Sequence, residues 1–246
     1  MRRAHGCLAI AAVAPHPTHE YTAGMLFALS VAAACEPSLM GQFPVPTAPP
    51  PKLTVETTSA KYDGNTYTGA HVTMRSASPV PAWTAVLEHP ELQDEWHPKE
   101  LGTERVERVE GTDFFQRTAI SVLGFTVRRQ VIARVHWLQS TVDRLHTCWS
   151  AGVPAEFARR VQSWDDGSTW QEHGFGGWTI TSLPGGGSAV SYQVWVDTNG
   201  IPAPLVAWGV SRTLPTLLGA FEAHVAELYA ASGAAPAAPT GAVAAP

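Results

Sequence analysis

The sequence is poor in charge, and this shortage argues against some partners. Charged residues make up 15% of the 246 residues, hydrophobic residues make up 45%, and the formal net charge is −5. Proteins that bind nucleic acid usually carry a surplus of Lys and Arg that meets the phosphates. We therefore expect no nucleic-acid partner, whereas the apolar fraction is large enough for a sizeable folded core.

Cysteine is also scarce. The chain holds only Cys7, Cys35 and Cys148. So small and scattered a set supports neither a disulfide framework nor a metal-binding knuckle. A reactive thiol needs a paired base and a lowered pKa, so we expect Cys148 to be a small buried hydrophobic residue instead.

No apolar run near the N-terminus is long enough to cross a membrane. The run Met25–Ala34 is about half of the ~20 residues that a spanning helix needs. It ends in small residues before Cys35 and resembles a bacterial lipoprotein signal, in which the cysteine becomes the acylated N-terminus. An ordinary secretory signal and a leader produced by a wrong start codon are the alternatives. We expect residues 1–35 to be an export signal and the protein to lie in the cell envelope; a start-site artefact would make it cytoplasmic.

Both flanks of the central region have the composition of unfolded segments. Residues 36–52 include the run PVPTAPPP, which is typical of a stiff linker because proline fixes φ and removes a donor. Residues 231–246 are mostly Ala, Pro and Gly, with no charge and nothing large to bury. We expect one folded domain over residues 53–230.

Within this domain, most of the chain predicts antiparallel strands. His71–Arg75 alternates as a strand does, and Ser78 with Pro79 predicts the N-cap and first turn of a helix that carries Trp83. Further strands are predicted at 101–110, 114–122, 125–138, 142–151, 158–164, 169–183 and 189–197. The short Gly- and Asp-containing links between them impose antiparallel neighbours.

The chain ends in a long amphipathic helix that Pro202 and Pro204 open. We expect Pro215 to kink or restart this helix. The apolar stripe of the helix consists of Leu214, Leu217, Leu218, Phe221, Val225 and Leu228. The expected fold class is α+β, with a curved antiparallel sheet covered by this helix; no strand-helix-strand crossover and no Gly-rich phosphate loop is present.

The stretch from Gly177 to Val210, GWTITSLPGGGSAVSYQVWVDTNGIPAPLVAWGV, resembles the last two strands and closing helix of START-type lipid-binding domains. The helix start at Ser78-Pro79, with Trp83, is similar to their first helical segment. These domains belong to the helix-grip superfamily, which includes polyketide cyclases. The resemblance covers residues 54–229 and implies a cavity that holds a lipid, a sterol or another hydrophobic molecule, with no cofactor.

Tryptophans are the main candidates for ligand contact. As a set they fit an aromatic cavity wall or a rim that meets a membrane surface, although core packing is the alternative for each one. The candidate ligand-binding residues are Trp137, Trp149, Trp170, Trp178, Trp195 and Trp208, with Leu218 and Phe221 of the helix. Gly200, Ile201, Pro202 and Leu205 form a small apolar loop that we expect to act as a gate.

Charged and histidine side chains on strands give weaker candidates. Arg134, paired with Glu172, would hold a ligand's polar head if both turned inward; solvated charges are the alternative. His136, His146 and His173 lie on three predicted strands without the close spacing of a metal motif, so we expect no metal.

We expect a non-enzymatic protein that binds or transfers a hydrophobic ligand. One alternative is an aromatase/cyclase-like enzyme that uses His136, Arg134 or Tyr192. The other is an interaction domain whose cavity is filled by its own side chains.

Overall fold

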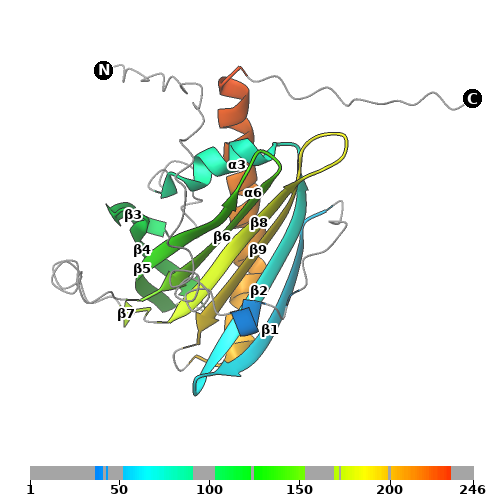
Figure 1. The fold of residues 1–246 in the computed structure, drawn as a ribbon. Helices are drawn as coiled ribbons and strands as arrows, with labels where there is room; N and C mark the ends of the chain where they lie inside the picture. The colour runs from blue at the N-terminus through cyan, green and yellow to red at the C-terminus, as the bar shows by residue number, and fades with distance from the viewer. Residues whose placement is uncertain are drawn as a thin grey trace, which may run out of the picture.

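The computed structural model describes residues 37–40, 43, 52–90, 103–122, 125–152, 169–171, 173–198 and 201–233. A curved sheet forms the middle layer of the described residues. The long helix α6 lies behind this sheet in Figure 1, and the short helix α2 lies in front of it. The expected α+β architecture, an antiparallel sheet closed by a long C-terminal helix, is confirmed.

The strands form one antiparallel sheet in which β2, from the start of the domain, pairs with β9, from its end. Its order is β1-β2-β9-β8-β6-β5-β4-β3, and among the described strands only β7 pairs in parallel, with β5. The strands are β1 (Thr54–Tyr62), β2 (Asn65–Ser76), β3 (Thr103–Glu110), β4 (Asp113–Val122), β5 (Phe125–Ser140), β6 (Arg144–Ala151), β7 (Thr169–Trp170), β8 (Gly174–Ser182) and β9 (Ser188–Asp197). The helices are α2 (Pro37–Met40), α3 (Val80–Leu87) and α6 (Ala203–Ala231).

The strand predictions agree with most of these elements to within a few residues, with two differences. The predicted strand 169–183 is divided into β7 and β8, because β7 runs parallel to β5 whereas β8 pairs antiparallel with β6. Both β7 and β8 run in the same direction as β5, because β8 is antiparallel to β6 and β6 is antiparallel to β5, so only the pairing partner changes between them. The predicted strand 158–164 lies outside the described residues.

Sequence reasoning missed β1, the partner of β2. Asp63 and Gly64 join the two strands with φ values of 47° and 80°, and Tyr62 pairs with Asn65. A two-residue link with positive φ at both positions is the turn that matches strand twist, and Asp-Gly is a strong signal for it. The dipeptide could have revealed this hairpin.

The two main helices differ from expectation in detail. Helix α6 is a single 29-residue element that continues through Pro215, so a restart there is wrong. Its buried residues Leu214, Leu218 and Phe221 pack in the main core, and this packing outweighs the lost hydrogen bond. Helix α3 begins at Val80 with Pro79 as N-cap, so the predicted Ser78 cap is wrong. In the described residues, no helix combines the length and apolar character that crossing a bilayer requires.

Part of the predicted linker packs on the sheet. Leu39 and Phe43 are 2% and 6% exposed, and Gln193 donates a side-chain hydrogen bond of 3.1 Å to the Phe43 carbonyl. We call this cluster the outer cluster; it consists of Leu39, Phe43, Tyr67, Phe175 and Trp195. The folded part of the chain therefore includes residues before Leu53, which corrects the expected boundary.

Cys148 also differs from its prediction. It is 1% exposed on β6, as a buried hydrophobic residue would be, but it is disulfide-bonded. The expectation that the cysteines form no disulfide is therefore wrong for this residue.

Candidate ligand cavity

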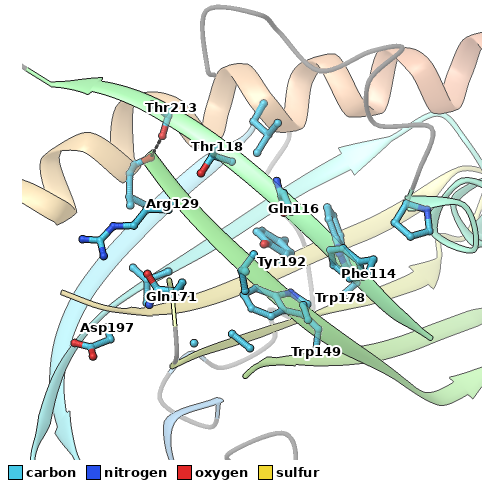
Figure 2. Close-up of a pocket in the computed structure, with 18 of the residues that line it drawn as sticks. Phe114, Gln116, Thr118, Arg129, Trp149, Gln171, Trp178, Tyr192, Asp197 and Thr213 are labelled. Atoms are coloured by element: carbon cyan, nitrogen blue, oxygen red, sulfur yellow. Dashed lines mark hydrogen bonds between the residues drawn. The ribbon is translucent and has the colours of Figure 1, made fainter. Parts of the chain in front are cut away.

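A cavity of about 690 Å³ lies between the sheet and the N-terminal half of α6 (Figure 2). Its wall is formed by residues of β4, β5, β6, β8, β9 and α6, with Gln171 and Thr198 beside them. The volume falls within the range of about 300–1,000 Å³ that small-molecule sites occupy in proteins. The expected internal cavity is therefore present.

Strand alternation decides which side chains reach the cavity. On β5, Val131, Ala133 and Val135 line it. The side chains between them, Ile132 and Arg134, turn to the other face because successive residues of a strand point to opposite sides. We call these two sides of the sheet the inner face, towards α6, and the outer face.

Aromatic rings crowd one end of the cavity. Trp178 contacts Tyr192 with ring centroids 4.3 Å apart and Phe221 of α6 with centroids 5.4 Å apart. Trp149 lies over Gly176, where an added Cβ would come within 2.8 Å of the indole ring. The missing side chain of Gly176 therefore gives Trp149 the space to lie against the sheet.

The phenol of Tyr192 belongs to this aromatic wall. Burial raises the pKa of Tyr192 far above its usual value of 10, and a hydrogen bond from the Trp149 side chain opposes this only in part. The phenol is therefore neutral at physiological pH and does not act as a charged group in the wall.

Polar side chains gather at the opposite end of the cavity. Arg129, Gln171 and Asp197 lie there in Figure 2, away from Phe114 and Trp149. Strand register agrees with the picture, because Gln171 donates its backbone N–H to the carbonyl of Gln130, the neighbour of Arg129. The cavity is thus amphipathic along its length.

Arg129 is the strongest polar feature of the cavity and was missed by sequence reasoning. Its Nη1 atom is buried and has no hydrogen-bond partner among the described residues. A buried cation is costly unless an acceptor meets it. The adjacent Arg128 is exposed, and the pair Arg128-Arg129 in an alternating strand signals that one of the two must face inward.

Several predicted ligand-binding residues do line the cavity. These are Trp137, Trp149, Trp178, Leu218 and Phe221, and the predicted gate residues Ile201 and Leu205 line it as well. Their contact with a ligand remains a prediction. Of the other two gate residues, Pro202 is exposed and caps α6, and Gly200 lies outside the described residues.

Three predicted tryptophans lie away from the cavity. Trp195 is fully buried in the outer cluster, because it is three residues after Tyr192 and so faces the other way. Trp170 packs on Phe115 with centroids 6.2 Å apart, in a cluster that does not border the cavity. Trp208 is 45% exposed, and the guanidinium of Arg212 lies 5.1 Å from the centroid of its ring.

Arg134 does not hold the role predicted for it. It lies on the outer face and donates two hydrogen bonds of 2.7 Å to Asp113, whose side chain is 4% exposed. The predicted partner Glu172 lies outside the described residues. Arg134 is therefore an ion-pair residue of the outer face. The arginine that lines the cavity is Arg129.

The histidines do not converge. His136 shares the outer face with Arg134, and its pKa is lowered by burial and by that arginine, while Asp113 raises it. In the described part of the chain, no three His, Cys, Asp or Glu side chains gather as a metal site requires. Of the three residues of the catalytic alternative, only Tyr192 lines the cavity.

Comparison with known proteins places this fold among the START-type helix-grip structures. No protein-family model and no curated protein matches the chain. The human StAR-related lipid transfer protein 5 aligns over 83% of this chain and 97% of its own, with 12% identity and a TM-score of 0.55. Human STARD10 aligns over 70% of this chain and 73% of its own, with 12% identity and a TM-score of 0.51. An aromatase/cyclase from a Streptomyces species aligns over 69% and 97%, with 12% identity and a TM-score of 0.42. At these identities the likeness shows the fold alone, and the ligand must be argued from the site.

Proposed function

We propose that this protein binds an amphipathic, lipid-like molecule in the cavity between the sheet and α6. The apolar body of the ligand lies against Trp149, Trp178 and Phe221. Its polar group accepts hydrogen bonds from Arg129 at the other end. The ligand is thus a molecule with one acceptor or anionic group and a hydrophobic body, and no chemical step is required of the protein.

The observation that supports this proposal is the buried Nη1 of Arg129 in a wall that is otherwise mostly apolar. Apolar surface removed from water stabilises a complex by about 25 cal/mol per Å² before ordering costs are subtracted. A hydrogen bond to a charged group adds about 1.5–3 kcal/mol. The apolar wall therefore supplies affinity, and Arg129 fixes the orientation.

The proposed entrance is the polar end of the cavity. Ile201 and Leu205 follow the last residues of β9, close to Asp197, and line the same space. We propose that this apolar loop is the gate and that the ligand enters with its hydrophobic body first. Hydrogen exchange tests the gate: the amides of Ile201, Ala203 and Leu205 should exchange faster than those of β8, and more slowly once ligand is bound.

We further propose that the protein is exported to the cell envelope and meets a membrane surface. The signal-like run before Cys35 and the disulfide at Cys148 support export, because disulfides persist in oxidising compartments. Exposed Trp208, on the same half of α6 as the gate, suits an interfacial contact.

Replacement of Arg129 tests the proposed function. We expect Arg129→Gln to bind a long-chain fatty acid about 10- to 100-fold more weakly, measured by quenching of tryptophan fluorescence, because one charged hydrogen-bond donor is lost. Binding of the fatty alcohol of the same chain length should change less. The matched control is Arg128→Gln, an exposed neighbour on the other face, which should bind both molecules normally.

Two results would contradict the proposal. Native mass spectrometry of the purified protein could show no retained lipid and no binding of either probe. Alternatively, Arg128→Gln could weaken binding as much as Arg129→Gln, which would assign the effect to the net charge of the protein.

A further inference from the structure

The phenol of Tyr192 places a polar group in the aromatic part of the cavity. Tyr192 lies on β9 and faces the inner side, and its ring contacts Trp178 with centroids 4.3 Å apart. The strand register sets Tyr192 opposite Trp178 and Trp178 opposite Thr147, so these three residues share one face. Figure 2 shows Tyr192 well apart from Arg129, which lies towards the polar end. The cavity therefore offers polar groups in two separate places.

Strand register also gives the separation of these two polar groups. Trp137 of β5 pairs with Thr147, which places it in the same row as Trp178 and Tyr192. Arg129 lies eight residues before Trp137 on the same strand, which corresponds to about 26 Å of strand. The curvature of the sheet and the length of the arginine side chain both shorten the direct path. One long, extended molecule can therefore meet Arg129 and Tyr192 at once.

The indole of Trp149 decides which atom of the phenol faces a ligand. An indole N–H can only donate, so the oxygen of Tyr192 accepts in the hydrogen bond between these two side chains. The phenol keeps one proton of its own to donate. The rings beside it, Trp149 and Trp178, carry no acceptor atom, and the backbone of β9 is engaged by β2 on one side and β8 on the other. The proton of Tyr192 is therefore left for a group in the cavity.

A buried donor of this kind selects a ligand by its oxygen atoms. Burial raises the pKa of Tyr192, so the phenol keeps its proton at physiological pH. A buried polar group without a partner weakens a complex, whereas a carbonyl oxygen on the ligand would accept the proton. A plain hydrocarbon chain offers no acceptor at this position. The lining is thus matched to a molecule that carries oxygen in two places.

We propose that the ligand carries a second acceptor, a ketone or another carbonyl, in the part of its hydrophobic body that lies against Tyr192. This inference rests on the proposed function and narrows its ligand class to long molecules with an acid or other acceptor at one end and a carbonyl towards the other. Tyr192 is then a specificity-determining residue, because its phenol donates to that carbonyl. Trp149 is a positioning residue that holds the phenol.

A pair of ligands and one isosteric variant test this inference. Hexadecanoic acid and its ω−1 keto analogue each compete with a fluorescent fatty acid for the wild-type protein and for Tyr192→Phe. We expect the substitution to weaken binding of the keto acid about 5- to 100-fold, because its ketone is left buried without a donor, and to leave hexadecanoic acid nearly unchanged. The matched control is Tyr67→Phe, a buried tyrosine of the outer cluster, which should change neither affinity.

Infrared spectroscopy gives a second measurement that needs no variant. With the ketone carbonyl isotopically labelled, its stretching band in the wild-type complex should lie lower than in a hydrocarbon solvent, because a hydrogen bond weakens the C=O bond. An unshifted band, or an equal effect or no effect of Tyr192→Phe on the two acids, would overturn this inference even while Arg129→Gln still weakens fatty-acid binding. Failure of both acids to bind the wild-type protein would instead refute the proposed function, and this inference with it.

Discussion

Trp178 and Trp195 lie on neighbouring strands of the same sheet, yet their surroundings differ. Trp195 is fully buried on the outer face, with the ring centroids of Phe43 and Phe175 at 5.4 and 6.3 Å. Trp178 is half-buried on the inner face and borders a cavity of about 690 Å³. The same type of side chain is therefore a filled core residue on one face and an open wall residue on the other.

The difference arises from the element that covers each face. On the outer face, Leu39 and Phe43 pack directly on the strands. On the inner face, the C-terminal half of α6 packs through Phe221 and Val225 into the main core, beside α3 (Figure 1). The N-terminal half of α6 passes over the curved sheet without filling the space beneath it. The long helix on a curved sheet thus leaves a cavity, whereas Leu39 and Phe43 pack directly on the other face.

The largest expected effect is the difference in stability between the alanine variants of the two tryptophans. Trp195→Ala should lower the free energy of unfolding by about 3–5 kcal/mol, because it removes a fully buried ring from a filled cluster. Trp178→Ala should cost less stability, since its ring already borders open space. Chemical denaturation measures both.

Ligand binding should show the reverse order. Trp178→Ala should weaken binding of a fluorescent fatty acid, whereas Trp195→Ala should leave the affinity of the folded protein nearly unchanged. If both variants lost equal stability and equal affinity, the proposed difference between the two faces would be wrong.

A Gly→Ala substitution on each face should change stability by a smaller amount, and the two changes should have opposite signs. At Gly69 a Cβ would lie 2.6 Å from the Trp195 ring, so Gly69→Ala should destabilise the protein by about 1–3 kcal/mol. At Gly209, which lines the cavity from α6, a Cβ meets nothing within 4 Å. Gly209→Ala should therefore stabilise the helix by about 0.5–1 kcal/mol while it narrows the cavity.

Thermal denaturation measures this pair, and Gly219→Ala on exposed α6 surface is the control. That control should stabilise the protein to a similar degree without any change in ligand affinity. A destabilising Gly209→Ala would mean that the inner face is already filled.

The smallest expected effects concern the dependence of stability on pH. A residue of the outer face should lower stability in acid, and a residue of the inner face should lower it in alkali. His71 on the outer face is 3% exposed and bonded to Ser191 at 2.8 Å; burial lowers its pKa, and Glu56 opposes this. Below about pH 6.5 the unfolded chain binds more protons at His71, so stability should fall as the pH falls, by at most about 1.4 kcal/mol per unit.

Tyr192 on the inner face should act in alkaline solution. Because its folded pKa is raised, the unfolded chain releases the phenol proton first, and stability should fall as the pH rises above about 10. Unfolding measured across pH should show that His71→Gln flattens only the acid limb. Tyr192→Phe should flatten only the alkaline limb, and the opposite assignment would contradict the burial described for either residue.

Much of the architecture was predictable because it depends on local periodicity. The alternation of β5 and the 3.6-residue stripe of α6 are patterns within single elements, and the structure contains both. The hairpin at Asp63-Gly64 was equally local and was missed although its signal was present. The packing of Leu39 and Phe43 was different, because a proline-rich composition says nothing of a distant surface that can bury two side chains.

The sequence by itself determined the strands, the closing helix and the relative facing of neighbours such as Arg128 and Arg129. Strand alternation shows that two adjacent residues point apart, but it cannot show which of them points towards a helix far along the chain. Only the tertiary structure decided that Arg129 and Trp178 border the cavity while Trp195 lies under Phe43. Which face becomes a cavity depends on the curvature of the sheet and on the element that covers it, and both arise from contacts between distant segments.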